Sequence, residues 1–413
     1  MSFFLSILLL LSSIISSIWF VLQALYFSSK KIVEIGYDRN KKISIIIAIK
    51  DEEVDTIRDL IRNLSELDYD NYEVIIVSDD KQEIFEKYLS IPYPKNFKIV
   101  RREVPTGRKA GALNFGVNLS SGDFLVFLDA EARVDKDFLK HVSYLLKYNV
   151  ISLRLKVRNA QGIGRIYSYF TDFSMSSLFR GRFMRGLYIF PNGSAFAIKK
   201  SILVNIGGWK ENVVTEDLEL GIRLALNNIR IYYFDEPSIS ILSPLNYYDL
   251  YMQIKRWAYG SGELFLDGLK LIKKGIKGLE GFLYVIQWGV YSLFLSIIIL
   301  LSLLPYSINV YIFIISIIIY GFSLLIYSSK NPKEADLSGI IVVFAAMIGF
   351  IQGFFRVKFS WRVTPKIHSD NLTPNSVEIL RYIFFIISIF DILLNKYSFF
   401  LIMFLLSITM FEL

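Results

Sequence analysis

Cysteine is absent from this chain of 413 residues, and the only histidines are His141 and His368. Without cysteine there is no disulfide framework and no thiolate chemistry, and two histidines exclude a histidine-rich metal centre. Any catalysis must therefore use carboxylates. The chain also has no Gly-x-Gly-x-x-Gly motif, which disfavours a dinucleotide cofactor.

The chain is 53% hydrophobic and 15% aromatic, which is too apolar for one soluble domain. Apolar stretches occupy both ends, at residues 3–27, 282–304, 307–327, 339–355, 377–395 and 398–412. We predict a membrane protein with a soluble insert. Its net charge of +8 is spread along the chain without a nucleic-acid-binding motif, so we assign it to phosphate and lipid contacts.

The first apolar stretch is long enough to span a bilayer core of about 30 Å at about 1.5 Å per helical residue. Lys30 and Lys31 follow it, whereas a cleaved signal peptide has its positive charges before the apolar segment. We predict a retained anchor whose N-terminus lies outside, with the next residues in the cytoplasm. If all five later stretches crossed, the basic segment 356–366 would lie outside, so we predict that the short stretch 339–355 is re-entrant or interfacial.

Between the apolar ends, strands and helices alternate. Residues 43–49, 72–78 and 123–128 are apolar runs of the kind that a parallel sheet buries on both faces, and residues 55–67 have helical spacing. This order predicts an α/β domain with a mostly parallel sheet, in which ligands bind at the carboxyl ends of the strands. Acidic residues follow all three runs, and we expect them to converge: Glu52, Asp79, Asp80, Asp129 and Glu131.

Asp129 and Glu131 lie one residue apart after the third run. A divalent cation on a nucleotide diphosphate binds one or two protein carboxylates together with phosphate oxygens. The pair therefore suits a divalent metal ion.

Two further clusters lie on predicted helices. Thr215 is a good N-cap for a helix that begins with Glu216 and Asp217, where acids complement the helix dipole, and the same field can keep Asp217 ionised until it accepts a proton. Gln253, Arg256 and Trp257 share one helix face, which offers an amide, a guanidinium for phosphate and a flat ring for a sugar. The alternative for this face is an interfacial helix at the lipid head groups. A similar mixture of aromatic residues and arginines predicts an interfacial helix with snorkelling arginines at residues 162–186.

In this order the clusters resemble the membrane-bound family 2 glycosyltransferases, which include cellulose, hyaluronan and poly-N-acetylglucosamine synthases and ceramide glucosyltransferases. The resemblance spans nearly the whole chain. It also rests on Asp79-Asp80, Gly107-Arg108-Lys109-Ala110-Gly111-Ala112-Leu113-Asn114, Asn192-Gly193-Ser194 and Trp361-Arg362-Val363-Thr364-Pro365-Lys366. The family usually has Asp-x-Asp where this chain has Asp129-Ala130-Glu131.

The resemblance implies a glycosyltransferase-A-type fold and an inverting, metal-dependent transfer from a UDP-sugar to an acceptor hydroxyl, with Asp217 as general base. Asp129 and Glu131 would bind Mg²⁺ or Mn²⁺. The nucleotide would contact Glu52, Asp79, Asp80, Lys109, Asp129 and Arg256. The acceptor would contact Asn192, Gly193, Ser194, Glu216, Gln253 and Trp257. Trp361, Thr364 and Lys366 would form a gating loop.

We therefore expect an anchor at 1–29, a glycosyltransferase domain at 40–245, interfacial helices at 246–281 and a transmembrane region at 282–413. The glycosyltransferase domain and a loop at 356–376 within the last region should be cytoplasmic. We expect the whole protein to be a multi-pass protein of the plasma membrane. Processive polysaccharide synthesis through a membrane channel is the favoured hypothesis. The alternatives are transfer of one sugar to a membrane lipid and a non-catalytic membrane protein that senses a nucleotide sugar.

Overall fold

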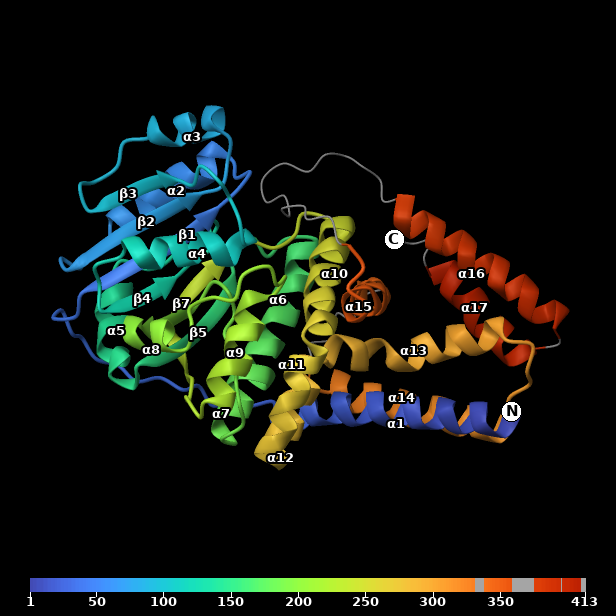
Figure 1. The fold of residues 1–413 in the computed structure, drawn as a ribbon. Coiled ribbons are helices and arrows are strands. Elements are labelled where there is room, and N and C mark those ends of the chain that lie inside the picture. The colour runs from blue at the N-terminus through green and yellow to red at the C-terminus, as the bar shows by residue number, and fades with distance from the viewer. Residues whose placement is uncertain (331–337, 359–374, 395, 410–413) are drawn as a thin grey trace.

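The computed structural model describes residues 1–330, 338–358, 375–394 and 396–409 (Figure 1). Within them, the chain between residues 43 and 241 forms a seven-stranded sheet of order β3-β2-β1-β4-β6-β5-β7. The strands are β1 Ile43–Ile49, β2 Tyr72–Ser78, β3 Phe97–Arg101, β4 Phe124–Phe127, β5 Val150–Val157, β6 Phe196–Lys199 and β7 Tyr232–Ile241.

The sheet is mixed but mostly parallel, as the sequence predicts. Strands β3, β2, β1 and β4 are parallel, β6 runs antiparallel to β4 and β5, and β5 is parallel to β7. The predicted strands 43–49 and 72–78 have the bounds of β1 and β2. Because β1, β2 and β4 are parallel neighbours, the acidic residues that follow them leave the same edge of the sheet.

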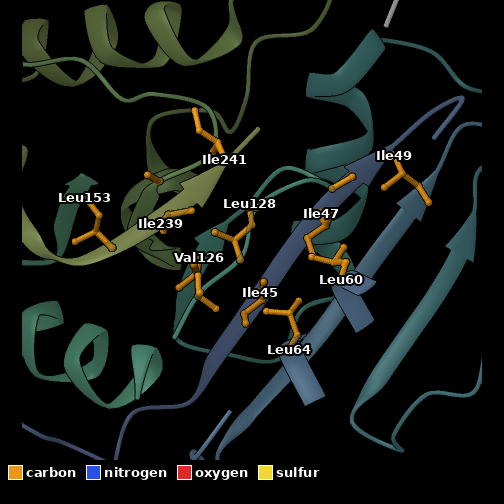
Figure 2. Close-up of a cluster of buried hydrophobic side chains, with 14 of the residues drawn as sticks. Ile45, Ile47, Ile49, Leu60, Leu64, Val126, Leu128, Leu153, Ile239 and Ile241 are labelled. Carbon is orange, nitrogen blue, oxygen red and sulfur yellow. The ribbon is translucent and has the colours of Figure 1, made fainter. Parts of the chain in front are cut away.

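Both faces of β1 are buried, which explains its unbroken apolar run. Ile45 and Ile47 pack with Leu60 and Leu64 of α2, Val54–Ser65, in a core that also contains α3, Gln82–Leu89, and α5, Phe138–Leu145 (Figure 2). Ile46 faces the opposite side. There it packs in a second core with α4, Arg108–Leu119, α8, Lys200–Asn205, and α9, Glu216–Leu226.

A group of apolar helices extends away from the sheet (Figure 1). It comprises α1 Ser2–Tyr26, α13 Gln287–Leu303, α14 Val310–Ser328, α15 Ser338–Phe354, α16 Asn375–Leu393 and α17 Tyr397–Thr409. Among the described residues, α1 and α14 are long and apolar enough to cross a membrane. The predicted run 282–304 is not one straight span, because α12, Ile276–Val285, meets α13 at a bend of 67°.

Helix α15 packs closely along α10, Tyr247–Glu263, which contains the Gln253, Arg256 and Trp257 cluster. A side chain at Gly353 would collide with the carbonyl oxygen of Tyr259, so the two backbones touch there. In Figure 1, α15 is seen end-on, whereas α1 and α14 lie across the view. The axis of α15 is therefore directed differently from those of α1 and α14.

In the segment 162–186, two of the four arginines do not snorkel as the composition predicts. It forms α6, Ile163–Ser174, a π-helical turn, Met175–Gly181, and α7, Arg182–Met184. Arg180 and Arg182 are buried and pair with distant carboxylates, at Asp235 and Glu280. The prediction was wrong for these two arginines because their partners lie far away in the sequence.

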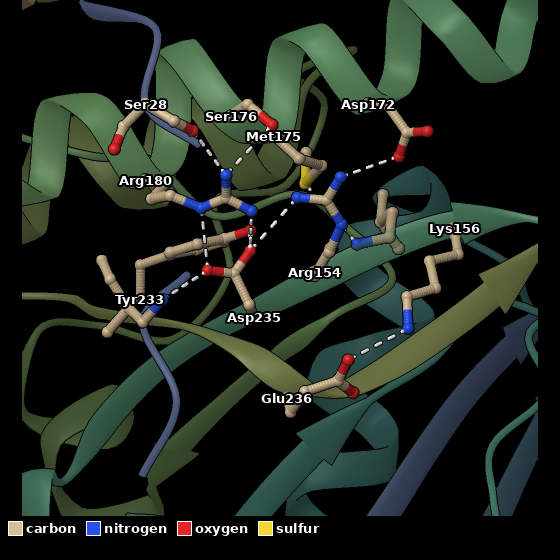
Figure 3. Close-up of polar contacts among 12 residues, drawn as sticks. Ser28, Arg154, Lys156, Asp172, Met175, Ser176, Arg180, Tyr233, Asp235 and Glu236 are labelled. Carbon is tan, nitrogen blue, oxygen red and sulfur yellow. Dashed lines mark hydrogen bonds and ion pairs between the residues drawn. The ribbon is translucent and has the colours of Figure 1, made fainter. Parts of the chain in front are cut away.

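Asp235, on β7, is completely buried and accepts hydrogen bonds from several elements (Figure 3). Arg180 donates through Nε and Nη2 at 2.8 and 2.5 Å, and Arg154 of β5 donates at 3.1 Å. The backbone N–H of Ile32 donates at 2.7 Å. Arg180 also donates to the carbonyl oxygen of Ser28. One carboxylate thus joins the sheet, the π-helical turn and the linker that follows α1.

We expect Asp235→Ala to destabilise the protein by about 3–5 kcal/mol, because it leaves buried guanidinium groups without their partner. Lys156→Ala is the matched control, since its ion pair with Glu236 is 3.1 Å long and 45% and 38% exposed, and it should change stability by less than about 1 kcal/mol. Thermal unfolding in one detergent, followed by tryptophan fluorescence, measures both. Equal midpoints for the two variants would contradict the role assigned to Asp235.

Candidate active site

One cavity of about 1650 Å³ begins at the carboxyl ends of β1, β2 and β4 and continues between α1, α13 and α14. Of the predicted site residues within the described ranges, all except Asp80 line this cavity: Glu52, Asp79, Lys109, Asp129, Glu131, Asn192, Gly193, Ser194, Glu216, Asp217, Gln253, Arg256 and Trp257. Trp361, Thr364 and Lys366 lie outside the described residues. Residues from separate predicted clusters thus share one space.

The two adjacent aspartates after β2 differ in position. Asp79 lines the cavity, and its carboxylate receives two hydrogen bonds from Arg102, at 2.6 and 2.5 Å. Asp80 is 4% exposed and accepts from the backbone N–H of Asp51 and the hydroxyl of Ser78. Asp80 therefore does not share the cavity with the other predicted site residues, because its carboxylate is used inside the loops that follow β1 and β2.

Lys109, in the first turn of α4, connects two of the predicted clusters. Its ammonium lies 2.8 Å from a carboxylate oxygen of Asp129 and 3.3 Å from one of Glu216. Burial alone would lower the pKa of Lys109, but the charges of Asp129 and Glu216 outweigh it and raise that pKa. Lys109 is therefore a fixed cation that neutralises carboxylates at this end of the cavity.

Asp217, in the first turn of α9, accepts hydrogen bonds from the backbone N–H groups of Gly193 and Leu218, both at 2.8 Å. Burial, with the neighbouring charge of Glu216, raises the pKa of Asp217 to about 6, although Lys109 opposes this. A carboxylate with a pKa near 6 is ionised at neutral pH and is a better base than an ordinary aspartate.

Gly193 brings the backbone close to both charged groups. A Cβ atom there would lie 3.2 Å from Nζ of Lys109 and 3.4 Å from a carboxylate oxygen of Asp217. Any other residue would crowd the two side chains on which the charge of the site depends. The glycine of the predicted Asn192-Gly193-Ser194 loop thus has a steric function.

Three neutral side chains in the cavity wall have buried polar atoms without a hydrogen-bond partner among the described residues. They are both side-chain amide atoms of Asn192, the hydroxyl of Thr215 and Oε1 of Gln253. Thr215 occupies the predicted N-cap position of α9, but its side chain makes no capping hydrogen bond. Buried polar groups without partners are costly, so atoms of this kind in a cavity wall indicate hydrogen bonds to a bound molecule.

The sequence analysis missed the part of the wall that comes from the apolar helices. Gln23 of α1 accepts a hydrogen bond from the hydroxyl of Tyr291 of α13, and both line the cavity. Trp288 also lines it, with its ring centroid 6.1 Å from that of Trp257. The position of Gln23 could have been predicted, because its side chain is an amide within an otherwise apolar stretch. The sequence analysis also missed Arg102, which directly follows the unpredicted strand β3.

The carboxylates of Asp129 and Glu131 fit a divalent cation only in part. No group of three or more histidine or acidic side chains among the described residues could hold a metal ion. Asp129 and Glu131 therefore provide two hard ligands, and an ion such as Mg²⁺ would need further oxygens from a bound phosphate or from water. The ammonium of Lys109 lies against Asp129 and marks a place where positive charge is stabilised.

The comparisons with known proteins all indicate similarity to glycosyltransferases. Residues 124–328 match the model described as Glycosyl transferase family group 2. A probable glycosyltransferase from Sulfolobus acidocaldarius is 29% identical over 366 residues, which cover 80% of this chain and 78% of that protein.

Two further relatives have more specific names. A beta-monoglucosyldiacylglycerol synthase from Trichormus variabilis is 32% identical over 57% of this chain, and the match spans about half of that protein, 52%. A poly-beta-1,6-N-acetyl-D-glucosamine synthase from Staphylococcus aureus is 28% identical over 62% of this chain and 66% of its own length.

Among solved structures, a mannosyltransferase from Pyrobaculum calidifontis in complex with GDP-mannose and Mn²⁺ has a TM-score of 0.59. It is 15% identical, and the match covers 86% of this chain and 99% of that protein. At this identity the likeness concerns the fold.

The raised pKa of Asp217 predicts a pH-dependent cost to stability. Its folded-state value of about 6 lies above the ordinary 3.8, so the ionised form is disfavoured in the folded protein above about pH 6 and the cost disappears below about pH 4. Asp217→Asn should raise the thermal midpoint at neutral pH by the equivalent of up to about 3 kcal/mol, and the gain should shrink as the pH falls from about 6 to 4.

Asp267→Asn is the control, because the pKa of Asp267 is shifted in the opposite direction from that of Asp217. Burial would raise the pKa of Asp267, but Lys270 and Lys210 outweigh it and lower that pKa, so its neutralisation should not stabilise the protein at neutral pH. The interpretation of Asp217 fails if both variants respond alike.

Proposed function

Because the chain is a family 2 glycosyltransferase with a glycosyltransferase-A-like fold, we propose that it transfers a sugar from a UDP-sugar to an acceptor hydroxyl with inversion at the anomeric carbon. The observation that carries this proposal is the position of Asp217 in one cavity with Asp79, Asp129 and Trp257. A base, a donor site and an acceptor platform are then available to one reaction.

The donor nucleotide lies, in this proposal, at the carboxyl ends of β1 and β2. Glu52 and Asp79 line the cavity there, and carboxylate oxygens accept hydrogen bonds from the imide of uracil and the hydroxyls of ribose. The two hydrogen bonds from Arg102 fix the orientation of the Asp79 carboxylate. The mannosyltransferase of similar fold was solved with a guanine nucleotide, so a comparison of UDP and GDP binding tests the uracil assignment.

The diphosphate lies next to Asp129, Glu131, Lys109 and Arg256 in this proposal. Asp129 and Glu131 would hold Mg²⁺ or Mn²⁺, which supplies charge neutralisation for the departing diphosphate when it is bound. Lys109 and Arg256 line the cavity and add positive charge for the same oxygens. The structure of the mannosyltransferase contains Mn²⁺, which supports the choice of ion.

The chemical step is a single in-line displacement. The acceptor oxygen forms a bond to the anomeric carbon while the bond from that carbon to the diphosphate breaks, and the acceptor proton passes to Asp217. The hydrogen bonds from Gly193 and Leu218 fix the direction of the Asp217 carboxylate. Trp257 provides a flat ring against which the acceptor can lie with its hydroxyl directed to the donor.

The membrane setting follows from the apolar helices. We propose that α1, the bent pair of α12 and α13, and α14 cross the bilayer, so that the sheet domain and the residues after α14 are cytoplasmic. Helix α15 then lies at the interface, since it packs on α10 and its axis is directed differently from those of α1 and α14. A membrane-impermeant label reacting with a cysteine at position 358 only after the cells are opened is the expected result. Labelling of intact cells would place this segment outside and overturn the topology.

Asp217→Asn should retain nucleotide binding and lose transfer by about 10²–10⁴-fold, because the acceptor hydroxyl loses its base. In the wild type, transfer should fall as the pH drops below about 6, where Asp217 becomes protonated. Purified protein given a panel of UDP-sugars with Mn²⁺ and membrane lipids tests both through release of UDP and labelled product. Asp267→Asn, outside the cavity wall, should behave as wild type, and an active Asp217→Asn variant would remove Asp217 from the base position.

Glu131→Gln should weaken the stabilisation of the protein by UDP together with Mn²⁺, because one of two hard ligands loses its charge. The shift in thermal midpoint caused by UDP and Mn²⁺ measures this without any catalysis. Asp137→Asn, whose carboxylate is 51% exposed, is the matched control and should keep the shift of the wild type. An unchanged shift in Glu131→Gln would exclude Glu131 as a ligand.

A further inference from the structure

We infer that the acceptor is a neutral, hydroxyl-bearing membrane lipid whose hydrocarbon chains occupy the part of the cavity between the apolar helices. This inference rests on the proposed function and names the acceptor class of the same site. It departs from the sequence-based preference for polysaccharide synthesis.

The first observation is the extent of the cavity. Its volume of about 1650 Å³ exceeds the roughly 300–1,000 Å³ that pockets for drug-sized ligands usually have. The same cavity continues from Asp79 and Asp217 to residues of α13, α14 and α17. A donor at the sheet edge therefore leaves a long branch for a second molecule.

The second observation is the chemistry of that branch. Its wall includes the apolar side chains of Leu295, Ile298, Ile317, Leu324, Ile402 and Leu406. None of the described residues that α1, α13, α14, α15 and α17 contribute to the cavity wall is charged. The hydroxyl of Tyr291 is already bonded to Gln23. A polysaccharide has hydroxyls on every ring and loses hydrogen bonds to water in such a wall, whereas a hydrocarbon chain gains from leaving water.

The third observation concerns the boundary between the branch and the catalytic end. The unpartnered polar atoms of Asn192, Thr215 and Gln253 belong to neutral amide and hydroxyl groups. These groups suit hydroxyls of a lipid head group. Lys109, the cation beside Asp217, is already paired with two carboxylates. Arg256, which also lines the cavity, is assigned to the donor diphosphate in the proposed function. A phosphate head group would therefore compete with the donor for these cations beside several carboxylates, and a neutral head group fits better.

The fourth observation is the position of α14. Ile317 and Leu324 line the cavity, while the next residues in the chain, Ile318 and Leu325, are 61% and 68% exposed. One helix thus has one face toward the branch and another toward the surroundings of the protein. Helix α14 is one of the two described helices long and apolar enough to cross a membrane, so the branch lies at the depth of lipid chains.

The test uses the full chain in phosphatidylcholine vesicles with labelled UDP-sugars and Mn²⁺. One set of vesicles contains dioleoylglycerol, its monoglucosyl derivative and a ceramide, a second contains a polyprenyl phosphate, and a third is given a soluble oligosaccharide. Label in a neutral product that partitions into organic solvent, from the first set only, is the expected result. Label mainly in a water-soluble polymer or an acidic lipid would overturn the inference, as would UDP release without a labelled neutral lipid.

A pair of variants on α13 tests the branch itself. Leu295→Trp places a large ring in the branch and should reduce transfer to the lipid by at least about tenfold. It should keep the stabilisation by UDP and Mn²⁺, which shows that the protein is folded. Leu300→Trp is the control, because Leu300 is 48% exposed on the same helix and does not line the cavity, and transfer should stay within about twofold of the wild type.

The outcomes separate this inference from the proposed function. If Leu295→Trp transfers sugar as well as the wild type, the branch does not hold the acceptor, although the enzyme still transfers sugar. If the wild type neither binds nor consumes any UDP-sugar in any vesicle set, the proposed function fails first.

Discussion

The buried carboxylate of Asp235 is the interaction on which the relative position of the sheet and the apolar helices depends. It accepts hydrogen bonds from Arg180, Arg154, Tyr233 and the backbone of Ile32, four points that lie on different elements (Figure 3). The walls of the cavity come from both sides of this junction. A catalytic space of this kind exists only if the two parts keep one relative orientation, and a fully satisfied buried charge network provides it.

Much of the sheet edge was predictable because its signals are local. The apolar runs that became β1 and β2 are unbroken, since both faces of those strands are buried, and the acids after them follow at once. The spacing of Gln253, Arg256 and Trp257 likewise predicts one helix face, and all three line the cavity from α10. Periodicity and strand ends therefore predicted most of the site residues that the structure brings together in one cavity.

The rest depends on contacts between residues far apart in the sequence. Nothing near Arg180 or Arg182 indicates that they are buried, because their partners lie 55 and 98 residues away. Asp79 and Asp80 are adjacent in sequence, yet one faces the cavity and the other is used inside the turn. The apolar branch was also beyond the sequence analysis, because a stretch of hydrophobic residues reads the same whether its helix faces lipid or a substrate.

The contact between α10 and α15 has a mechanical consequence. At Gly353 the two helices meet backbone to backbone, and no flexible side chain there can absorb a shift of one against the other. If α15 lies at the bilayer surface, its height relative to that surface is set by the membrane thickness and by the lateral pressure of the head groups. In the proposed topology that height would be transmitted to the helix that carries Trp257, and the lipid composition of the membrane would then affect catalytic alignment.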